Sequence, residues 1–484
     1  MKVTLAGATV DRRFWVKDPA ATPETISAAY ARISHSPRTL GALRDAAVAE
    51  VEKARMSNEN IIYRMGHSSV AEHAVFNLDI EDASRLLVEF IESHRLASFT
   101  ERSQRYVFFG DKEFLIPEEL AGTRLEDEVR SLEREKFDLY IMMVDDEGYR
   151  EKYGDKLLEQ ARYILGLTCP TDLGLTVNAR ELEYMISRAA AHPLAEVRQL
   201  SRALLDQCGS LAPSLIKYTE GTDHVEKTRE MLRESMGAIS VERETGSISC
   251  VSTADDGRVC SERPTSHDDP ESEIAAVLLF ENSGMPFSTC REISRKMTDD
   301  ELMDLFLPVF RNYPVHSSLP RAFEVMDLTF DFDISASAFA QLKRHRMASL
   351  FVQDYNPGRW ITPPLYLENP ERARDYVDLM RRSAALYHRI RKDHGVRVAE
   401  YVLTNAHKRR VVFRINLREL YHFVRLRSDE HAQDEIRRIS DGMVEILKEQ
   451  FPLVTAMLCG KDTYAGTRKR ILGCDSDDRG GEER

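Results

Sequence analysis

Hydrophobic and polar residues alternate in two separate stretches of the chain, and each stretch predicts a half-buried strand. Polar residues such as Asn77 and Asp79 stand between the apolar positions. The apolar positions are Ala74, Phe76, Leu78 and Ile80 in the first stretch, and Met326, Leu328, Phe330, Phe332 and Ile334 in the second. A period of two with one polar face is typical of an antiparallel sheet whose other face packs on a core.

Helical spacing of apolar residues surrounds these strands. Long amphipathic helices are predicted over residues 125–143 and 376–390, and a helix over 39–64. Residues 220–270 are rich in Ser, Thr, Asp, Glu and Gly, which predicts a connector with a strand at 247–252 as its one ordered element. Residues 473–484 are acidic and contain glycine, so we expect a tail that does not pack.

A basic motif follows a helical stripe in both halves of the chain. His-Arg-x-Ala-Ser occurs at 94–98 and again at 345–349. His-Ser-Ser at 67–69 and 316–318 precedes the motifs, and Asn-x-Arg-Glu-Leu at 178–182 and 416–420 follows them. Landmarks in the same order predict a duplicated α+β domain, with copies at 1–219 and 271–460, a connector at 220–270 and a tail at 461–484.

The density of arginine around the first motif suggests a phosphorylated ligand. Guanidinium groups bind phosphate oxygens in planar, bidentate, charge-assisted pairs, and hydroxyl groups add further donors. A solvated helix end is the alternative.

Composition narrows the class of protein. The chain has 484 residues and a net charge of -13, which argues against a general nucleic-acid binder. Its seven cysteines are scattered and never in Cys-x-x-Cys spacing, so we expect unpaired thiols in a reducing cytoplasm and no metal site; a Cys250–Cys260 pair is the alternative. No stretch resembles a signal peptide or a membrane span of about 20 apolar residues.

The motifs resemble those of the flavin-dependent thymidylate synthases, the ThyX family, with the signature Arg-His-Arg-x-x-Ser-x-Asn-Glu-x-Ser-x-Arg-Tyr. The first copy departs at Ser93 and Thr100 and keeps the rest. The second keeps Arg344, His345, Arg346 and Ser349, then has Val352, Asp354 and Asn356 where Glu, Ser and Arg belong. Residues 426–433 also resemble a family motif, Leu-Arg-Ala-Asp-Ser-His-Ala-Gln.

The resemblance implies an α+β fold with an antiparallel sheet flanked by long helices, and a specific reaction. A one-carbon unit passes from methylenetetrahydrofolate to C5 of dUMP, FAD supplies the hydride, and NADPH reduces the FAD. The implied assembly is a homodimer that reproduces the family's four-domain arrangement.

The resemblance also assigns site residues. Arg427 would stabilise the uracil N3/O4 edge, with a salt bridge to Asp429 or Glu430 as the alternative. The residues expected to hold dUMP are Glu101, Ser103, Gln104, Arg105, Arg162, Gln341 and Arg344. Those expected to hold the flavin are His67, Ser69, His94, Arg95, Glu101, Asn178, Arg180, Arg344, His345, Arg346, Asn416, Arg418 and His422. Tyr184 and His422 occupy a family Asn position.

The departures fall on different elements of the two copies. The first has Phe90 and Ser93 in place of the opening Gln and Arg, and Ala189 at the position of the later Arg; the second has Glu400 in place of the earlier Arg. We therefore expect the two halves to form composite sites. The alternatives are a catalytically lapsed nucleotide- or flavin-binding protein with a regulatory or scaffold role, and a flavin enzyme that acts on another pyrimidine nucleotide.

Overall fold

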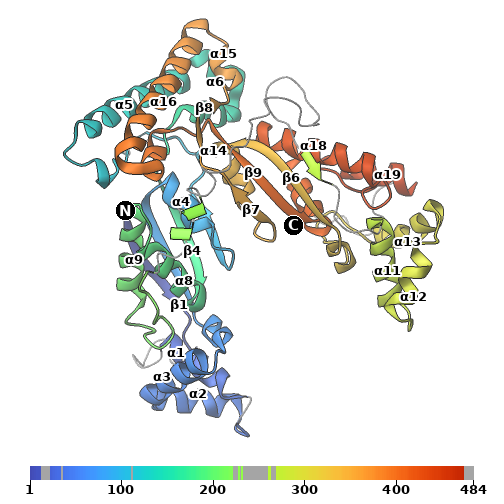
Figure 1. Ribbon diagram of the computed structural model, residues 1–484. Coiled ribbons are helices and arrows are strands. Elements are labelled where there is room, and N and C mark those ends of the chain that lie inside the picture. The colour runs from blue at the N-terminus through green and yellow to red at the C-terminus, as the bar shows by residue number, and fades with distance from the viewer. Residues whose placement is uncertain are drawn as a thin grey trace. The chain divides into compact units, whose positions relative to one another are not determined.

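Two antiparallel sheets, one from each copy of the repeat, form the framework of this computed structural model (Figure 1). The structure describes residues 1–11, 22–33, 36–110, 113–221, 227–228, 231–232, 260–262 and 269–473. Two compact units comprise residues 1–243 with 362–406, and 244–361 with 407–484. The first unit therefore contains the first copy together with a segment of the second. The predicted strand at 247–252 and the Cys250–Cys260 pair lie outside the described side chains.

The first unit contains a sheet with the strand order β1–β2–β4–β3. Its strands are β1 (Lys2–Ala8), β2 (Val75–Ser84), β3 (Ala97–Glu101) and β4 (Pro170–Asn178). Phe76, Leu78 and Ile80 are buried, whereas Asn77 and Asp79 are exposed, as the alternation predicts. Helices α8 (Ala179–Ala190) and α9 (Ala195–Cys208) pack on the buried face.

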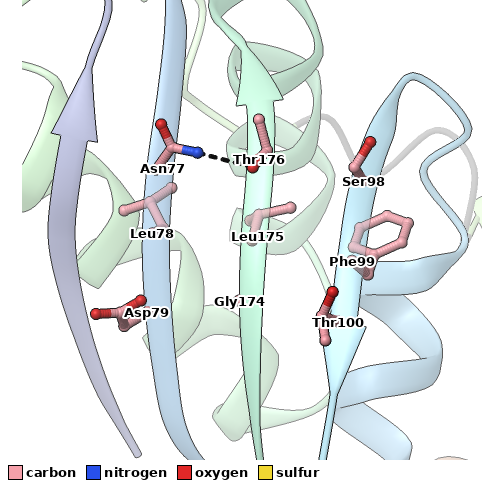
Figure 2. Close-up of a pocket in the computed structure, with 9 residues that line it drawn as sticks. All are labelled: Asn77, Leu78, Asp79, Ser98, Phe99, Thr100, Gly174, Leu175 and Thr176. Atoms are coloured by element: carbon pink, nitrogen blue, oxygen red, sulfur yellow. Dashed lines mark hydrogen bonds between the residues drawn. The ribbon is translucent and has the colours of Figure 1, made fainter. Parts of the chain in front are cut away.

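A shallow hollow of about 210 Å³ lies on the polar face of this sheet (Figure 2). Gly174 pairs with Asp79 on one side and Thr100 on the other, so its missing side chain opens the hollow. Asn77 Nδ2 donates a hydrogen bond of 2.8 Å to Thr176 Oγ1 at the rim. The residues expected to bind substrate or flavin do not line this hollow.

Short helices lie between β1 and β2 in the chain. The stretch 39–64, expected as one helix, forms α2 (Leu40–Ala49), α3 (Val51–Glu59) and a π-helical turn (Asn60–Arg64), because the chain leaves helical geometry at Glu50. With α1 (Pro23–Ala31) these helices enclose a small core of their own. Its members are Ala28, Ala29, Leu43, Ala47 and Ala54.

Segments from the two copies meet inside the first unit. Helix α5 (Arg124–Asp145) packs against α16 (Pro370–Ala399), and Arg382 and Arg389 of α16 pair with Glu135 and Glu128 of α5. Gly166 forms an antiparallel bridge with Thr404, flanked by bonds of 2.9 Å from Leu167 N to Leu403 O and from Asn405 N to Leu165 O. Equivalent segments thus meet symmetrically, as in an isologous dimer.

Further helices complete the first unit. They are α4 (Arg85–Glu92), α6 (Glu147–Tyr153), α7 (Leu157–Ala161), α15 (Pro364–Leu367) and the 3-10 turns at Ser68–His73, Arg162–Ile164 and Glu400–Val402.

The second unit contains a sheet with the order β5–β6–β9–β7, and β8 also pairs with β9. The strands are β5 (Cys260–Glu262), β6 (Asp327–Ser335), β7 (Ser349–Val352), β8 (Asn356–Trp360) and β9 (His407–Asn416). Its helices are α11 (Pro270–Glu281), α12 (Phe287–Ser294), α13 (Asp299–Arg311), α14 (Ala336–Leu342), α17 (Leu417–Arg427), α18 (Asp434–Gln450) and α19 (Tyr464–Leu472). Phe330 faces Phe413 across the sheet in an aromatic-rich core.

Helix α19 corrects the expectation of a tail from residue 461. The Tyr464 side chain is buried and its hydroxyl donates to Tyr313 O, while Arg468 Nη2 donates to Arg311 O at 2.8 Å. These bonds attach the helix to the end of α13.

The expected α+β class, with two antiparallel sheets flanked by long helices, is confirmed. Among the described ranges, every helix is too short or too polar to cross a membrane. Cys169, Cys208, Cys290 and Cys459 are buried free thiols.

Candidate functional site

In the first unit, Arg162 lies at the centre of a buried cluster of charged side chains. It begins the 3-10 turn after α7 and is only 5% exposed. Around it, Arg105 pairs with Glu159, and Arg85 pairs with Glu101. Among the described residues, this cluster thus contains three arginines and two carboxylates.

The Arg162 guanidinium carries the excess positive charge. Its Nε and Nη2 atoms are buried and have no hydrogen-bond partner within the described part of the chain. Burial, with a smaller contribution from the neighbouring Arg85 and Arg105 charges, lowers the pKa of Arg162 to about 10. A buried guanidinium is strongly destabilising unless an anion pairs with it. The cluster is therefore suited to an anionic ligand.

Ser103 and Gln104 lie beside this cluster, as expected of residues that hold the same ligand. Ser103 Oγ accepts a bond of 3.2 Å from the Arg105 amide. Gln104 Oε1 accepts a bond of 3.0 Å from Asn405 Nδ2, which also donates to Arg162 O at 3.0 Å. Asn405 belongs to the second copy of the repeat, and sequence reasoning missed it because the contact depends on folding.

A pocket of about 250 Å³ opens next to Ser103 and Gln104. Its other lining residues are Arg102, Val107, Phe108, Phe109, Gly110, Pro170 and Thr171. The pocket combines apolar walls with a few polar groups, which is the usual composition of a small-molecule site.

In the second unit, Arg427 converges with two residues of the second motif. Its Nε donates to His345 Nε2 at 3.1 Å, Nη1 donates to Gln341 Oε1 at 3.3 Å, and Nη2 donates to Gln341 O at 3.1 Å. Gln341 belongs to α14, His345 follows that helix, and Arg427 is the last residue of α17. The geometry brings Arg427 and Gln341, which were expected at dUMP, together with His345, which was expected at the flavin. The alternative partners Asp429 and Glu430 instead contact His431.

The bond from Arg427 fixes the state of His345. An imidazole nitrogen that accepts from a guanidinium is unprotonated, so the ring is neutral and carries its proton on Nδ1, 3.7 Å from Glu419 Oε1. Burial lowers the pKa of His345 to about 4. His345, Glu419 and His422 offer atoms within 4.8 Å of one another, a possible cation triad. We assign no metal to it, because Nδ1 holds the proton and Arg427 already places a positive charge beside the ring.

The first copy contains an arginine that sequence reasoning missed. Arg188 of α8 lies 3.4 Å through Nη1 from His94 Nε2 and from Ser93 Oγ, and its guanidinium lies over the Phe90 and Tyr184 rings. Burial, and to a smaller extent the Arg188 charge, lowers the pKa of His94 to about 4. Arg188 thus contacts the motif histidine as Arg427 does in the second copy.

This contact corrects the alignment that placed Ala189 opposite Arg427. Glu196 accepts from the Ser84 amide at 2.9 Å, and Glu435 accepts from the Ser335 amide at 3.0 Å, so the two glutamates are equivalent. Arg188 and Arg427 each lie eight residues before that glutamate. The second copy has one additional residue between its capping asparagine and the arginine, and the spacing to the glutamate was the signal that could have revealed the match.

Asn178 and Asn416 act as helix caps. Their side-chain oxygens each accept a bond of 2.9 Å from the third residue of α8 and α17, at Glu181 and Glu419. Arg180 pairs with Glu72 at 2.5 Å, and Arg418 pairs with Glu324 at 3.1 Å. The resemblance assigned these four residues to the flavin, and each has a structural partner in the protein.

The remaining residues expected at the flavin are mostly accessible. Arg344 Nε donates to Ala340 O at 3.3 Å. The exposed side chains of this set are His67, Ser69, Arg95, Arg344, Arg346 and His422.

The counterpart of Arg162 in the second copy carries the opposite charge. Arg162 and Glu400 each lie 16 residues before the capping asparagine of their copy. Glu400 is 1% exposed and accepts a bond of 3.0 Å from Arg397, which stands where the first copy has Glu159. A phosphate would be repelled at Glu400.

The chain matches the sequence model of the thymidylate synthase complementing protein family twice, over residues 17–214 and 264–453. The chain belongs to this family. The duplication and the family resemblance predicted from the motifs are thereby confirmed.

Relatives of the family match one or both copies. A UPF0159 protein of Thermoplasma acidophilum is 23% identical over 455 residues, which cover 83% of this chain and 88% of that protein. The flavin-dependent thymidylate synthases of Clostridium tetani and Geobacter sulfurreducens are 27% and 30% identical over 44% and 40% of this chain, and 89% and 81% of those proteins are covered. The family is thus one of enzymes.

A solved structure of ThyX from Helicobacter pylori, complexed with FAD and dUMP, corresponds to 46% of this chain and 100% of its own. Its TM-score is 0.33 and its sequence identity 18%.

Proposed function

We propose that the protein is a flavin-dependent thymidylate synthase, which converts dUMP to dTMP with methylenetetrahydrofolate as one-carbon donor and NADPH as reductant. The observation that carries the proposal is the buried Arg162 guanidinium, whose Nε and Nη2 have no hydrogen-bond partner among the described residues. A nucleotide phosphate supplies the missing negative charge and acceptor atoms. Arg105, Ser103, Gln104 and Glu101 would bind the phosphate and ribose.

Arg427 would act on the uracil ring in this proposal. Uracil C5 is a weak nucleophile, and negative charge that develops along N3 and O4 makes the ring more electron-rich. A fixed guanidinium stabilises that charge without reorganisation. Gln341 and the neutral His345 would hold Arg427 in place, and Arg344 would add a phosphate contact. That Arg162 and Arg427 serve the same nucleotide stays a prediction, which variants in each copy can test.

The accessible basic side chains of the motifs fit a flavin dinucleotide. Its diphosphate needs cationic donors that a ligand can reach from solvent, and Arg344, Arg346 and Arg95 are exposed, with His67 and Ser69 as further polar contacts. When bound, FAD supplies the hydride that completes the methyl group. The protein binds and orients the ring and excludes water from it.

The experiment is NADPH oxidation by FAD-loaded protein with dUMP and methylenetetrahydrofolate, followed by detection of dTMP. Nucleotide-dependent oxidation with dTMP formation supports the proposal. Oxidation that depends on another pyrimidine nucleotide supports the alternative of a flavin enzyme that acts on that nucleotide. Nucleotide binding without turnover supports the lapsed protein, which the altered residues Val352, Asp354, Asn356 and Glu400 favour as the second candidate.

The proposal includes a cytoplasmic homodimer. Sedimentation of the FAD-loaded protein tests the dimer, and it is contradicted if the chain remains a monomer at the concentration of the activity assay.

A further inference from the structure

A second cavity lies among the short helices of the first unit, and none of the residues assigned above lines it. Its volume is about 650 Å³, within the range of ligand sites. It is formed by the end of α1, by α2 and α3, and by the turn that follows α3. The lining residues are Ala31, Arg32, Ser36, Arg38, Leu43, Ala46, Lys53, Met56, Ser57, Asn60, Ile61 and Met65.

Three cations line this cavity in a protein whose net charge is -13. Arg32 is fixed across its wall, because Nη2 donates to Lys53 O at 3.2 Å and Nε to Ser57 Oγ at 3.5 Å. Lys53 pairs with Glu50 at 2.9 Å, and the charges of Lys53, Arg32 and Arg38 together lower the pKa of the Glu50 carboxyl. The three cations therefore act on one small region, with one carboxylate between them.

Flexible apolar side chains complete the cavity. Met56 is 66% exposed and Met65 is 53% exposed, and Leu43 and Ile61 also line the cavity. Methionine adapts its shape to flat and irregular ligands, and its sulfur makes favourable contacts with aromatic rings. An exposed apolar surface beside fixed cations is typical of a binding site.

We propose that this cavity binds a small polyanion with a flat, heteroaromatic body, and that it takes the anionic end of one co-substrate. The inference rests on the proposed function. Two co-substrates share this chemistry: the carboxylates of a folate with its glutamate chain, and the additional phosphate of NADPH. Arg32, Arg38 and Lys53 bind the anionic groups, while Met56 and Met65 contact the apolar body.

The test compares the binding of four probes to the FAD-loaded full-length protein by isothermal titration calorimetry. The probes are NADP⁺ against NAD⁺, and triglutamyl folate against monoglutamyl folate. In at least one pair, the more anionic member, NADP⁺ or triglutamyl folate, should bind more tightly to the wild type than the other member does. In Arg38→Glu/Lys53→Glu, that preference should fall by about tenfold, since two solvent-exposed charge contacts are replaced by repulsion.

Two control variants keep the test decisive. Arg64→Glu reverses a positive charge at an exposed residue of the turn after α3. Arg64 does not line the cavity, so this variant should leave the preference unchanged. Arg38→Ala/Lys53→Ala removes the charges without introducing repulsion, and should give a smaller loss in the same direction. Circular dichroism confirms that each variant folds.

Equal binding of both members of both pairs overturns the proposal. So does an equal loss in Arg64→Glu, or a loss of FAD without any change in the four probes, which would assign the cavity to the flavin. Binding of dUMP, measured on the same samples, separates the two claims: retained dUMP binding with unchanged probe preferences refutes this inference alone, whereas wild-type protein that binds no dUMP refutes the proposed function.

Discussion

The two copies of the domain carry the same turn of chain with its charges exchanged. In the first copy, Glu159 precedes Arg162, and in the second, Arg397 precedes Glu400. Each carboxylate has an arginine partner, Arg105 for Glu159 and Arg397 for Glu400. Among the described residues, Arg162 Nε and Nη2 have no hydrogen-bond partner, whereas Arg397 and Glu400 of the second copy pair with each other. Duplication preserved the internal charge balance while it changed which copy can accept an anion.

The arginine of the later helix shows the opposite behaviour. Arg188 and Arg427 both contact the histidine of their motif, although one additional residue separates the second from its capping asparagine. Their surroundings differ, because Arg427 is also held by Gln341, whereas Arg188 lies over Phe90 and Tyr184. The first copy thus keeps the arginine and lacks the amide that would fix it. The difference suggests that the copies divide a common set of functions.

The largest predicted effect separates these two arginines. Arg427→Ala should lower the rate of dTMP formation by about 10² to 10³, as expected when a donor that stabilises developing charge is removed. Arg188→Ala is the matched change in the other copy and should alter the rate no more than about threefold, since the surrounding set is incomplete there. Steady-state kinetics at saturating dUMP provides the measurement. Equal losses in both variants would show that the copies are functionally equivalent.

The charge exchange predicts a binding effect. Arg162→Met should raise the KM for dUMP about 10- to 100-fold, while kcat changes much less. The reason is that the variant loses a charge-assisted hydrogen bond to the phosphate, which contributes about 1.5–3 kcal/mol to binding. Glu400→Gln provides the comparison in the second copy and should leave KM unchanged. A fall in kcat with an unaltered KM in Arg162→Met would contradict the role of Arg162 in phosphate binding.

The two buried histidines predict how stability depends on pH. Burial lowers the pKa of His94 and His345 to about 4, below the ordinary value near 6.5, so the folded protein keeps them neutral. The contribution of each neutral histidine to the free energy of unfolding is fully present above pH 6.5. It is lost as the pH falls towards 4, by about 2–3 kcal/mol for each histidine. Urea unfolding at pH 7 and pH 4.5 measures it. His94→Gln and His345→Gln should each flatten the dependence, and a steeper dependence would refute it.

The capping asparagines predict the smallest effect. Asn178→Ala and Asn416→Ala should each lower the free energy of unfolding by about 1 kcal/mol, because the first turn of α8 or α17 loses its side-chain acceptor. Thermal unfolding of the FAD-free protein measures the loss, and FAD titration shows whether affinity changes as well. A loss of FAD affinity without a change in stability would assign these residues to the flavin alone.

The sequence predicted half of the central strands of the two sheets. Alternation identified β2 and β6, but their central neighbours β4 and β9 were not predicted. The start of β9, His407–Arg410, is strongly basic and resembles a loop. It forms a strand because β6 pairs with it on one side and β8 pairs with its first two residues on the other. The placement of residues 362–406 in the first unit depends on contacts between distant segments, such as α5 with α16, which local patterns do not encode.

The site was predicted in part for the same physical reason. Family motifs identified Arg162, Arg427, Gln341 and His345, and the structure brings the last three together. Arg85, Glu159 and Asn405 were missed because they belong to the site through burial and pairing. Arg188 was missed because it lies one residue closer to its capping asparagine than Arg427 does. Its spacing to Glu196, which equals that of Arg427 to Glu435, was not considered.

The stoichiometry of dUMP binding to the FAD-loaded chain tests the central claim most directly. Only the first copy has a buried, unpartnered arginine at the phosphate position among the described residues, so calorimetry should give one dUMP per chain, with affinity lost in both Arg162→Met and Arg427→Ala. Two equivalent dUMP molecules per chain, or one whose affinity ignores either substitution, would contradict the account.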